Sequence, residues 1–178
     1  MHEGSKKRSA ATRNAIVAAY NRLFLERRLR RIRVGHVAAE AGVGRSTLYD
    51  HFSGAEPLHM AALTPLFAIL ADAAAGRGDP AATEWLLAHF WEYRQRARDT
   101  FGGRTGEQAM RLLAGLVEER LEAPLALPRR RAARQLAAAA AAPVQAWLLG
   151  EASSTPDLLA VHLCRSGAAL VAALRAPD

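Results

Sequence analysis

The sequence has little of what marks a secreted, disulfide-bonded or membrane-spanning protein. It contains one cysteine, Cys164, so no disulfide can form within the chain, and a reducing, cytoplasmic setting is expected. Residues 1–12 are polar and basic and lack the apolar segment of a secretory signal. No apolar run approaches the roughly 18 residues that span a bilayer. These absences predict a protein that does not enter a membrane.

Motifs of common enzyme and metal sites are absent as well. The six histidines show neither the His-Glu-x-x-His pattern nor the Cys/His spacing that binds zinc. The sequence also lacks a Gly-x-Ser-x-Gly motif, a P-loop and a dinucleotide-binding fingerprint. Cys164 lies in an apolar helical pattern, where a thiol is more often buried than reactive. We therefore expect no enzymatic activity, no cofactor and no metal.

Alternating strand patterns are nearly absent too, whereas helical periodicity fills the chain. Apolar spacing, capping residues and glycine or proline breaks predict eight or nine helices and no sheet. The expected helices span residues 10–27, 34–41, 45–51, a capping box at 53–56 to about 76, 80 to a break at 102–103, 105–121, 129–149 and 156–174. We thus predict an all-α protein, with a small domain in residues 1–55 and a helical domain in residues 56–178.

Positive charge is concentrated in the first third of the chain. Residues 1–55 contain 11 Lys or Arg and 4 Asp or Glu, which accounts for the whole net charge of +7. Because neutralising phosphates releases counterions, a polyanion is the expected partner of this third. A basic solubilising tail and an anionic membrane surface are the alternatives. The membrane is disfavoured because the first helix needs its apolar face for the core of its own domain.

Residues 34–52 have the pattern of a helix-turn-helix. Ala38 supplies a small residue where two helices touch, and Gly42 suits a turn that needs a positive φ. The spacing is four residues from Ala38 to Gly42 and six from Gly42 to Leu48. The apolar residues expected to fill the wedge between the helices are Val37, Val43 and Leu48. This spacing predicts a DNA-binding motif whose second helix enters the major groove.

The same stretch resembles the DNA-binding domain of TetR-family regulators. The likeness spans roughly residues 10–60 and rests on AAEAGV at residues 38–43 and RSTLYDHF at residues 45–52. The rest of the chain resembles the family only in helix content and length. The resemblance implies a bacterial transcriptional repressor that binds a palindromic operator as a dimer and responds to a small ligand.

The resemblance also implies roles for single residues, and the chemistry of their side chains agrees. Thr47, Tyr49 and His51 would hydrogen-bond phosphates and fix the register of the recognition helix. Arg45 and Ser46, near the start of that helix, would reach base edges, because arginine suits the O6 and N7 acceptors of guanine.

Three positions depart from the family pattern. Ala55 stands where a lysine is usual, so one phosphate contact is missing. Arg33 replaces a threonine or serine and could supply a phosphate contact of its own. Gly44 replaces a serine as N-cap of the recognition helix. Two further basic stretches have two interpretations each. Residues 27–33 are a solvated face or a flank on the DNA backbone. Residues 6–8 are expected to form a mobile arm, either free or in contact with a minor groove or phosphates.

Aromatic residues crowd the middle of the chain, and one helix cannot bury all of them on a single face. Some are therefore expected to line a cavity or an interface, with His89 as the main polar group; a histidine bonded to a carbonyl in the core is the alternative. The candidate ligand-binding residues are Phe67, Trp85, His89, Tyr93, Met110 and Leu113.

The last two helices are expected to form the homodimer interface, since a helix-turn-helix monomer reads only one half-site. Small residues 137–142 would allow close approach of a second helix. The larger apolar residues expected there are Trp147, Leu159, Leu163, Leu170 and Leu174. The alternatives to a ligand-responsive repressor are a DNA-binding regulator without an effector and an enzyme or carrier built on a helical bundle.

Overall fold

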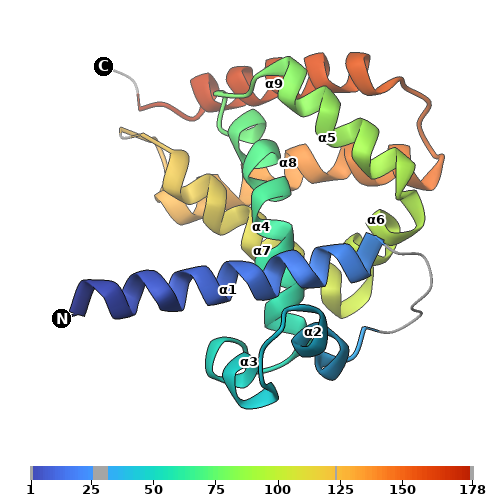
Figure 1. Ribbon diagram of the computed structural model, residues 1–178. Coiled ribbons are helices and arrows are strands. Elements are labelled where there is room, and N and C mark those ends of the chain that lie inside the picture. Colours follow the sequence, from blue (N-terminus) through green and yellow to red (C-terminus); the bar gives the residue numbers. More distant parts are fainter. Residues whose placement is uncertain (1, 26–31, 123, 177–178) are drawn as a thin grey trace. The chain divides into compact units, whose positions relative to one another are not determined.

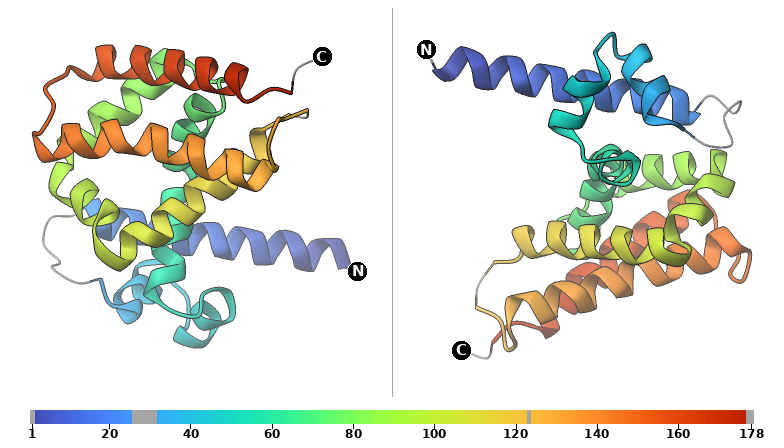
Figure 2. Two further views of the ribbon diagram at one scale, coloured as in Figure 1. Left: turned by 180° about the vertical axis from the view of Figure 1, so that it is seen from behind. Right: turned by 90° about the horizontal axis from the view of Figure 1, so that it is seen from below.

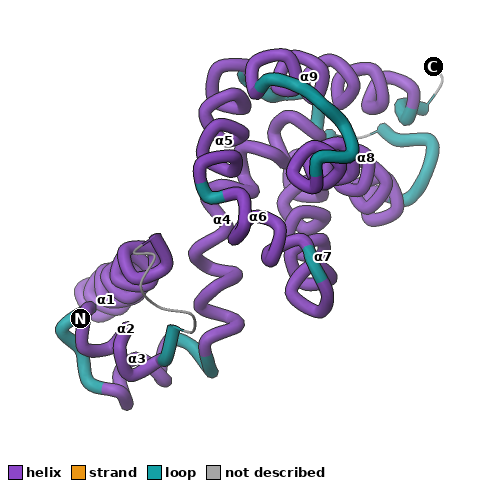
Figure 3. The backbone as a smooth tube through the Cα atoms, turned by 90° about the vertical axis from the view of Figure 1, so that its right-hand side faces the viewer, coloured by secondary structure: helices purple, strands orange, loops and turns teal. Residues whose placement is uncertain are grey.

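A computed structural model describes residues 2–25, 32–122 and 124–176. Within these ranges the chain forms helices and loops, with an isolated bridge between Leu125 and Arg175 and no strand (Figures 1 and 3). The helices are α1 (His2–Leu25), α2 (Val34–Glu40), α3 (Arg45–His51), α4 (Ala55–Ala74), α5 (Pro80–Glu92), α6 (Arg94–Phe101), α7 (Gly103–Arg120), α8 (Arg129–Leu149) and α9 (Pro156–Ala173). The all-α fold class is confirmed.

The chain divides into two compact units, residues 1–63 and 64–178. The division falls inside α4, next to Pro65, which the helix contains. Leu58 and Ala62 belong to the core of the first unit, although the predicted boundary would assign them to the second. The first part of α4 therefore completes the small domain, because its apolar face covers that core.

Helix α1 is longer than predicted. It begins at His2, so Lys6, Lys7 and Arg8 are exposed residues of a helix and not a mobile arm. The hydroxyl of Thr12 donates to the carbonyl of Arg8 at 3.0 Å, which links the predicted part of the helix to the added part. Apolar periodicity missed these turns because residues 2–9 contain no apolar side chain, whereas Glu3, Lys6, Lys7 and Arg8 are good helix formers.

Two ends of helices in the second unit also differ from the prediction. The helix that begins after Asp79 stops at Glu92, and Tyr93 has φ −106° and ψ 31°, so α6 is a separate helix. The N-cap of α7 is Gly102 and not Thr105. Other ends are confirmed: the Asp79 carboxylate accepts from the amide of Ala81 at 3.0 Å, and α8 has the predicted bounds.

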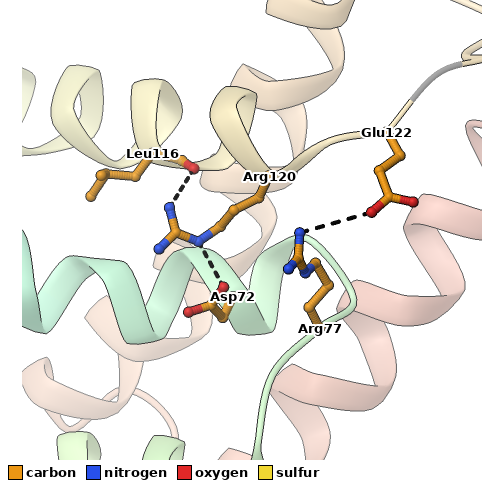
Figure 4. A network of polar contacts seen from close by, with 5 residues as sticks. All are labelled: Asp72, Arg77, Leu116, Arg120 and Glu122. Carbon is orange, nitrogen blue, oxygen red and sulfur yellow. Dashed lines mark hydrogen bonds and ion pairs between the residues drawn. The ribbon is translucent and has the colours of Figure 1, made fainter.

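In the second unit, α5 packs along α9 and α7 packs along α8, which also contacts α9 (Figure 2). The largest fully buried side chains of this unit are Phe67, Leu70, Leu86, Leu87, Leu113, Leu136, Leu148 and Leu163. A polar contact joins α4 to α7: Arg120 donates from Nε to Asp72 at 2.7 Å and from Nη1 to the carbonyl of Leu116 at 2.8 Å (Figure 4). Arg77 and Glu122 lie nearby, with 3.9 Å between their charged atoms.

One described helix, α4, is long and apolar enough to cross a membrane by length and composition. This corrects the estimate from apolar runs, because leucine, isoleucine, phenylalanine and alanine keep the mean hydropathy of this helix high although polar residues such as His59 and Thr64 interrupt the run. Core helices of soluble proteins pass the same test, and 44% of the relevant window is buried. Leu58, Phe67 and Leu70 are fully buried in the chain's own cores, so this feature is weak evidence for a membrane span.

Candidate nucleic-acid interface

The turn between α2 and α3 is built by a hydrogen-bonded reversal at Gly42. Gly42 has φ +66°, as its place in the motif predicts. Its amide donates to the carbonyl of Ala39 at 3.1 Å, and the amide of Val43 donates to the carbonyl of Ala38 at 3.0 Å. This pair of bonds is a Schellman motif, which satisfies the last carbonyls of α2 and reverses the chain. The turn therefore fixes the start of α3 relative to α2.

The core beneath the motif determines which side of α3 is exposed. Leu48 is fully buried and Phe52 nearly so, together with Val37 and Ala38 of α2. Burial of a leucine side chain contributes about 2 kcal/mol, so the orientation of α3 is well determined. Arg45, Ser46 and Tyr49 are left on the exposed side of α3. The predicted inward side of α3, Leu48 and Phe52, is confirmed, while Thr47 and His51, predicted outside, are half-buried.

Side chains of α1 contact α2, Phe52 after α3 and the start of α4. The guanidinium of Arg22 donates to Glu40 of α2 at 2.8 Å, and that of Arg13 lies 5.0 Å from the centre of the Phe52 ring. The hydroxyl of Tyr20 and Nδ1 of His59 are hydrogen-bonded at 2.9 Å. The His59 ring also lies 5.4 Å from that of Phe24. These contacts join α1 to α2, to the end of α3 and to the start of α4.

The partly buried position of His59 predicts that acid destabilises the first unit. Burial lowers the pKa of His59 below its ordinary value of 6.5. The unfolded chain then binds a proton near pH 6.5 while the folded unit does not, so stability is full above that pH and falls as the pH drops below it. The melting temperature of the wild type should fall more between pH 7.5 and 5.5 than that of His59→Gln. His162→Gln, at an exposed position, serves as the control; equal falls in wild type and His59→Gln would contradict this role.

A groove of about 500 Å³ lies on the exposed side of the motif. Its lining consists of Ile32, Arg33, Val34, Gly35, His36, Arg45, Tyr49 and Ala55. Every ionisable residue in this set is basic or a tyrosine. The side chains of Arg33, His36 and Arg45 make no ion pair or hydrogen bond with another described residue. Like charges gathered in a concavity repel one another and attract an anion, so the groove suits a phosphate backbone.

The absence of a side chain at Gly35 in α2 leaves space for the guanidinium of Arg45. A Cβ atom at position 35 would lie 3.1 Å from Nη2, 3.4 Å from Nε and 3.5 Å from Cζ of Arg45. The guanidinium therefore lies close to the backbone of Gly35, where the side chain of any other residue would crowd it. The sequence pattern did not indicate Gly35 or His36, because their relation to Arg45 is a contact between helices.

The predicted DNA-contacting residues fall into two groups. Arg33, Arg45 and Tyr49 line the groove. Ser46 is exposed beside it, while Thr47 and His51 are half-buried and outside the groove lining. Residues 27–31 of the basic flank lie outside the described residues. All six candidates retain some exposure, so their proposed contacts with DNA stay compatible with the fold.

The predicted ligand-binding residues of the second unit lie in three different environments. Trp85 and His89 of α5 and its C-cap residue Tyr93 form a row, with the His89 ring 5.6 Å from Trp85 and 4.9 Å from Tyr93. Burial lowers the pKa of His89, and Glu92 opposes that shift. Phe67 and Leu113 are fully buried, and the Phe67 ring packs on Phe101 at 5.7 Å. The sixth residue, Met110, lines a groove between α7 and α8.

The fold defines a helix-turn-helix unit followed by a helical unit. Among solved structures, the chain is similar to the TetR family repressor AlkX from Dietzia sp. strain DQ12-45-1b, implicated in biodegradation of n-alkanes. The identity is 20% and the TM-score 0.55, and the match covers 91% of this chain and 96% of that chain. No family model and no curated protein matches the chain. The likeness supports the predicted TetR-like fold, while membership in that family stays a prediction.

Proposed function

We propose that the chain is a DNA-binding transcriptional regulator, most simply a repressor, that binds a palindromic operator through α3. The observation that carries the proposal is the basic groove, whose ionisable lining is Arg33, His36, Arg45 and Tyr49 without a carboxylate. Its place on the exposed side of a helix-turn-helix is where DNA is read by this motif. The concentration of net charge in residues 1–55 and the TetR-like fold support the same function.

The proposed contacts follow from chemistry and position. Arg45 and Ser46 occupy the first turn of α3, the part of a recognition helix that reaches base edges. Thr47, Tyr49 and His51 would donate to phosphates and fix the register of the helix. Arg33, at the N-cap of α2, would contact the phosphate backbone from the other wall of the groove.

Arg33→Ala and Tyr49→Phe separate charge from hydrogen bonding at the phosphates. Arg33→Ala should weaken binding to all DNA sequences alike and reduce the slope of log K against log salt by about 1. Tyr49→Phe should weaken binding to all sequences by roughly 3- to 10-fold and leave that slope unchanged, because it removes a hydrogen bond and no charge. Fluorescence anisotropy at 50 and 200 mM salt measures both. An unchanged affinity for both variants would contradict this docking of the motif.

A homodimer through α8 and α9 is part of the proposal, but the interface residues expected from the sequence need correction. Trp147, Leu159 and Leu163 are buried in the protomer's own core, because α9 packs against α5 and α8. Leu149, Leu158 and Val161 are exposed large apolar residues at the facing ends of these helices. We therefore place these three residues in the interface with a second copy.

Leu158→Glu should convert a dimer into a monomer at micromolar concentration, since it places a charge within the proposed interface. Ala88→Glu, at an exposed position on α5, should leave the dimer intact. Light scattering coupled to gel filtration measures the mass. A wild-type monomer, or a dimeric Leu158→Glu variant, would contradict this interface.

We also propose that a small molecule bound to the second unit controls DNA binding. The accessible members of the predicted set are Trp85 and His89 on α5, its C-cap residue Tyr93, and Met110 on α7. Phe67 and Leu113 could act only as the floor of a site, because they are fully buried. If no ligand changes DNA binding, the alternative is a DNA-binding regulator without an effector. A thermal-shift screen against small apolar and charged compounds distinguishes the two.

A further inference from the structure

A second groove, of about 970 Å³, lies between α7 and α8. Its walls include Phe101 of α6, Met110, Arg111 and Gly115 of α7, and Arg130 and Arg134 of α8. Small residues create the space: a Cβ atom at Gly115 would meet nothing within 4 Å. Most of this lining was not among the predicted ligand-binding residues, which contributed only Met110.

The charges of this groove are incompletely compensated. Arg130 and Arg134 are one turn apart on the same face of α8, and their side chains make no ion pair or hydrogen bond with a described residue. Arg111 pairs with Glu107 only at 3.9 Å, with both side chains largely exposed. The groove therefore presents three guanidinium groups and, with Glu118, two carboxylates. A single negative charge on a ligand would balance this lining, whereas a dianion would exceed it.

We propose that the groove binds a small organic monocarboxylate with an apolar body. Guanidinium groups match a carboxylate in planar, bidentate geometry, and Arg130 and Arg134 are free to adopt it. Phe101, Met110 and Ala138 supply apolar surface in the same groove for the rest of the ligand. Binding of the carboxylate can be measured without DNA. Only its role in regulation rests on the proposed control of DNA binding by a small molecule.

The test compares 2-naphthoate with the neutral 2-naphthamide by isothermal titration calorimetry on the full chain. The acid should bind at least about tenfold more tightly than the amide, because hydrogen bonds between charged groups are the stronger ones. Arg134→Gln should lose at least about tenfold in affinity for the acid. Arg165→Gln, at an exposed position on α9 outside the groove, should bind as the wild type does.

Gly115→Leu tests the location without removing a charge. The open space at position 115 means that the variant should fold with an unchanged or higher melting temperature and fill the groove. Loss of 2-naphthoate binding in this variant would support the site. Equal affinity for acid and amide, full binding by both Arg134→Gln and Gly115→Leu, or no saturable binding at millimolar acid would overturn it. DNA affinity measured on the same samples shows separately whether the proposed function holds.

Discussion

Replacing Arg45 with alanine should weaken binding to the preferred DNA site by about 5- to 150-fold, or roughly 1–3 kcal/mol. Arg45 occupies the first turn of α3 and lines the basic groove, so its guanidinium can reach a guanine edge. Loss of a base contact removes discrimination at one position of each half-site. Selection from a random DNA pool should therefore return a consensus relaxed at that position.

Gly35→Ala provides the matched variant, because it keeps Arg45 and changes only the position that its side chain can adopt. The new Cβ would come within 3.1 Å of the flexible end of Arg45, which can move aside with little effect on stability. We expect wild-type melting behaviour together with altered preference at the same base position. The same consensus from wild type and Arg45→Ala would show that Arg45 does not read a base.

Gly167→Ala should destabilise the second unit severely. A Cβ at this position would collide with the carbonyl oxygen of Ala73 and lie 3.0 Å from its carbonyl carbon and 3.2 Å from the oxygen of Ala74. Both neighbours are backbone atoms, which cannot rotate away as a side chain can. Overpacking of this kind costs up to about 3 kcal/mol, which corresponds to a fall of roughly 6–12 °C in melting temperature.

Gly115→Ala is the control for this effect. Position 115 is also a helical glycine, but a Cβ there would meet no atom within 4 Å. Exchange of glycine for alanine in an open helical position should stabilise the chain by about 0.5–1 kcal/mol. Thermal unfolding followed by circular dichroism measures both variants. A Gly167→Ala melting temperature within about 2 °C of the wild type would contradict the close approach of α9 to the end of α4.

The helix-turn-helix could be predicted from the sequence because its geometry depends on local constraints. Gly42 marks the turn, since few other residues adopt its φ of +66°. The apolar positions Val37 and Leu48 then orient both helices, and α3 has the predicted bounds. The sequence pattern is therefore sufficient to place Arg45 and Tyr49 on the exposed side of the motif.

Features that depend on neighbouring helices could not be predicted in this way. The break at Tyr93 carries no glycine or proline, so the periodicity continues across it. The row of Trp85, His89 and Tyr93 has helical spacing, but whether it faces the core depends on α9, which packs along α5. The prediction that Trp147 lies in an apolar environment is confirmed, but its expected partner, a second copy of the chain, is wrong. Its ring stacks on Trp91 of the same chain at 4.8 Å.

The most direct test of DNA recognition is selection of DNA from a random pool by the wild-type chain, followed by titration of the enriched sequence at 50 and 200 mM salt. An inverted repeat should emerge, with half-sites about one helical turn, roughly 34 Å, or somewhat more apart. Affinity for it should fall at least about tenfold at the higher salt, because the basic groove exchanges counterions for phosphates. Failure to enrich any sequence, or an affinity indifferent to both salt and Arg45→Ala, would contradict DNA recognition by this groove.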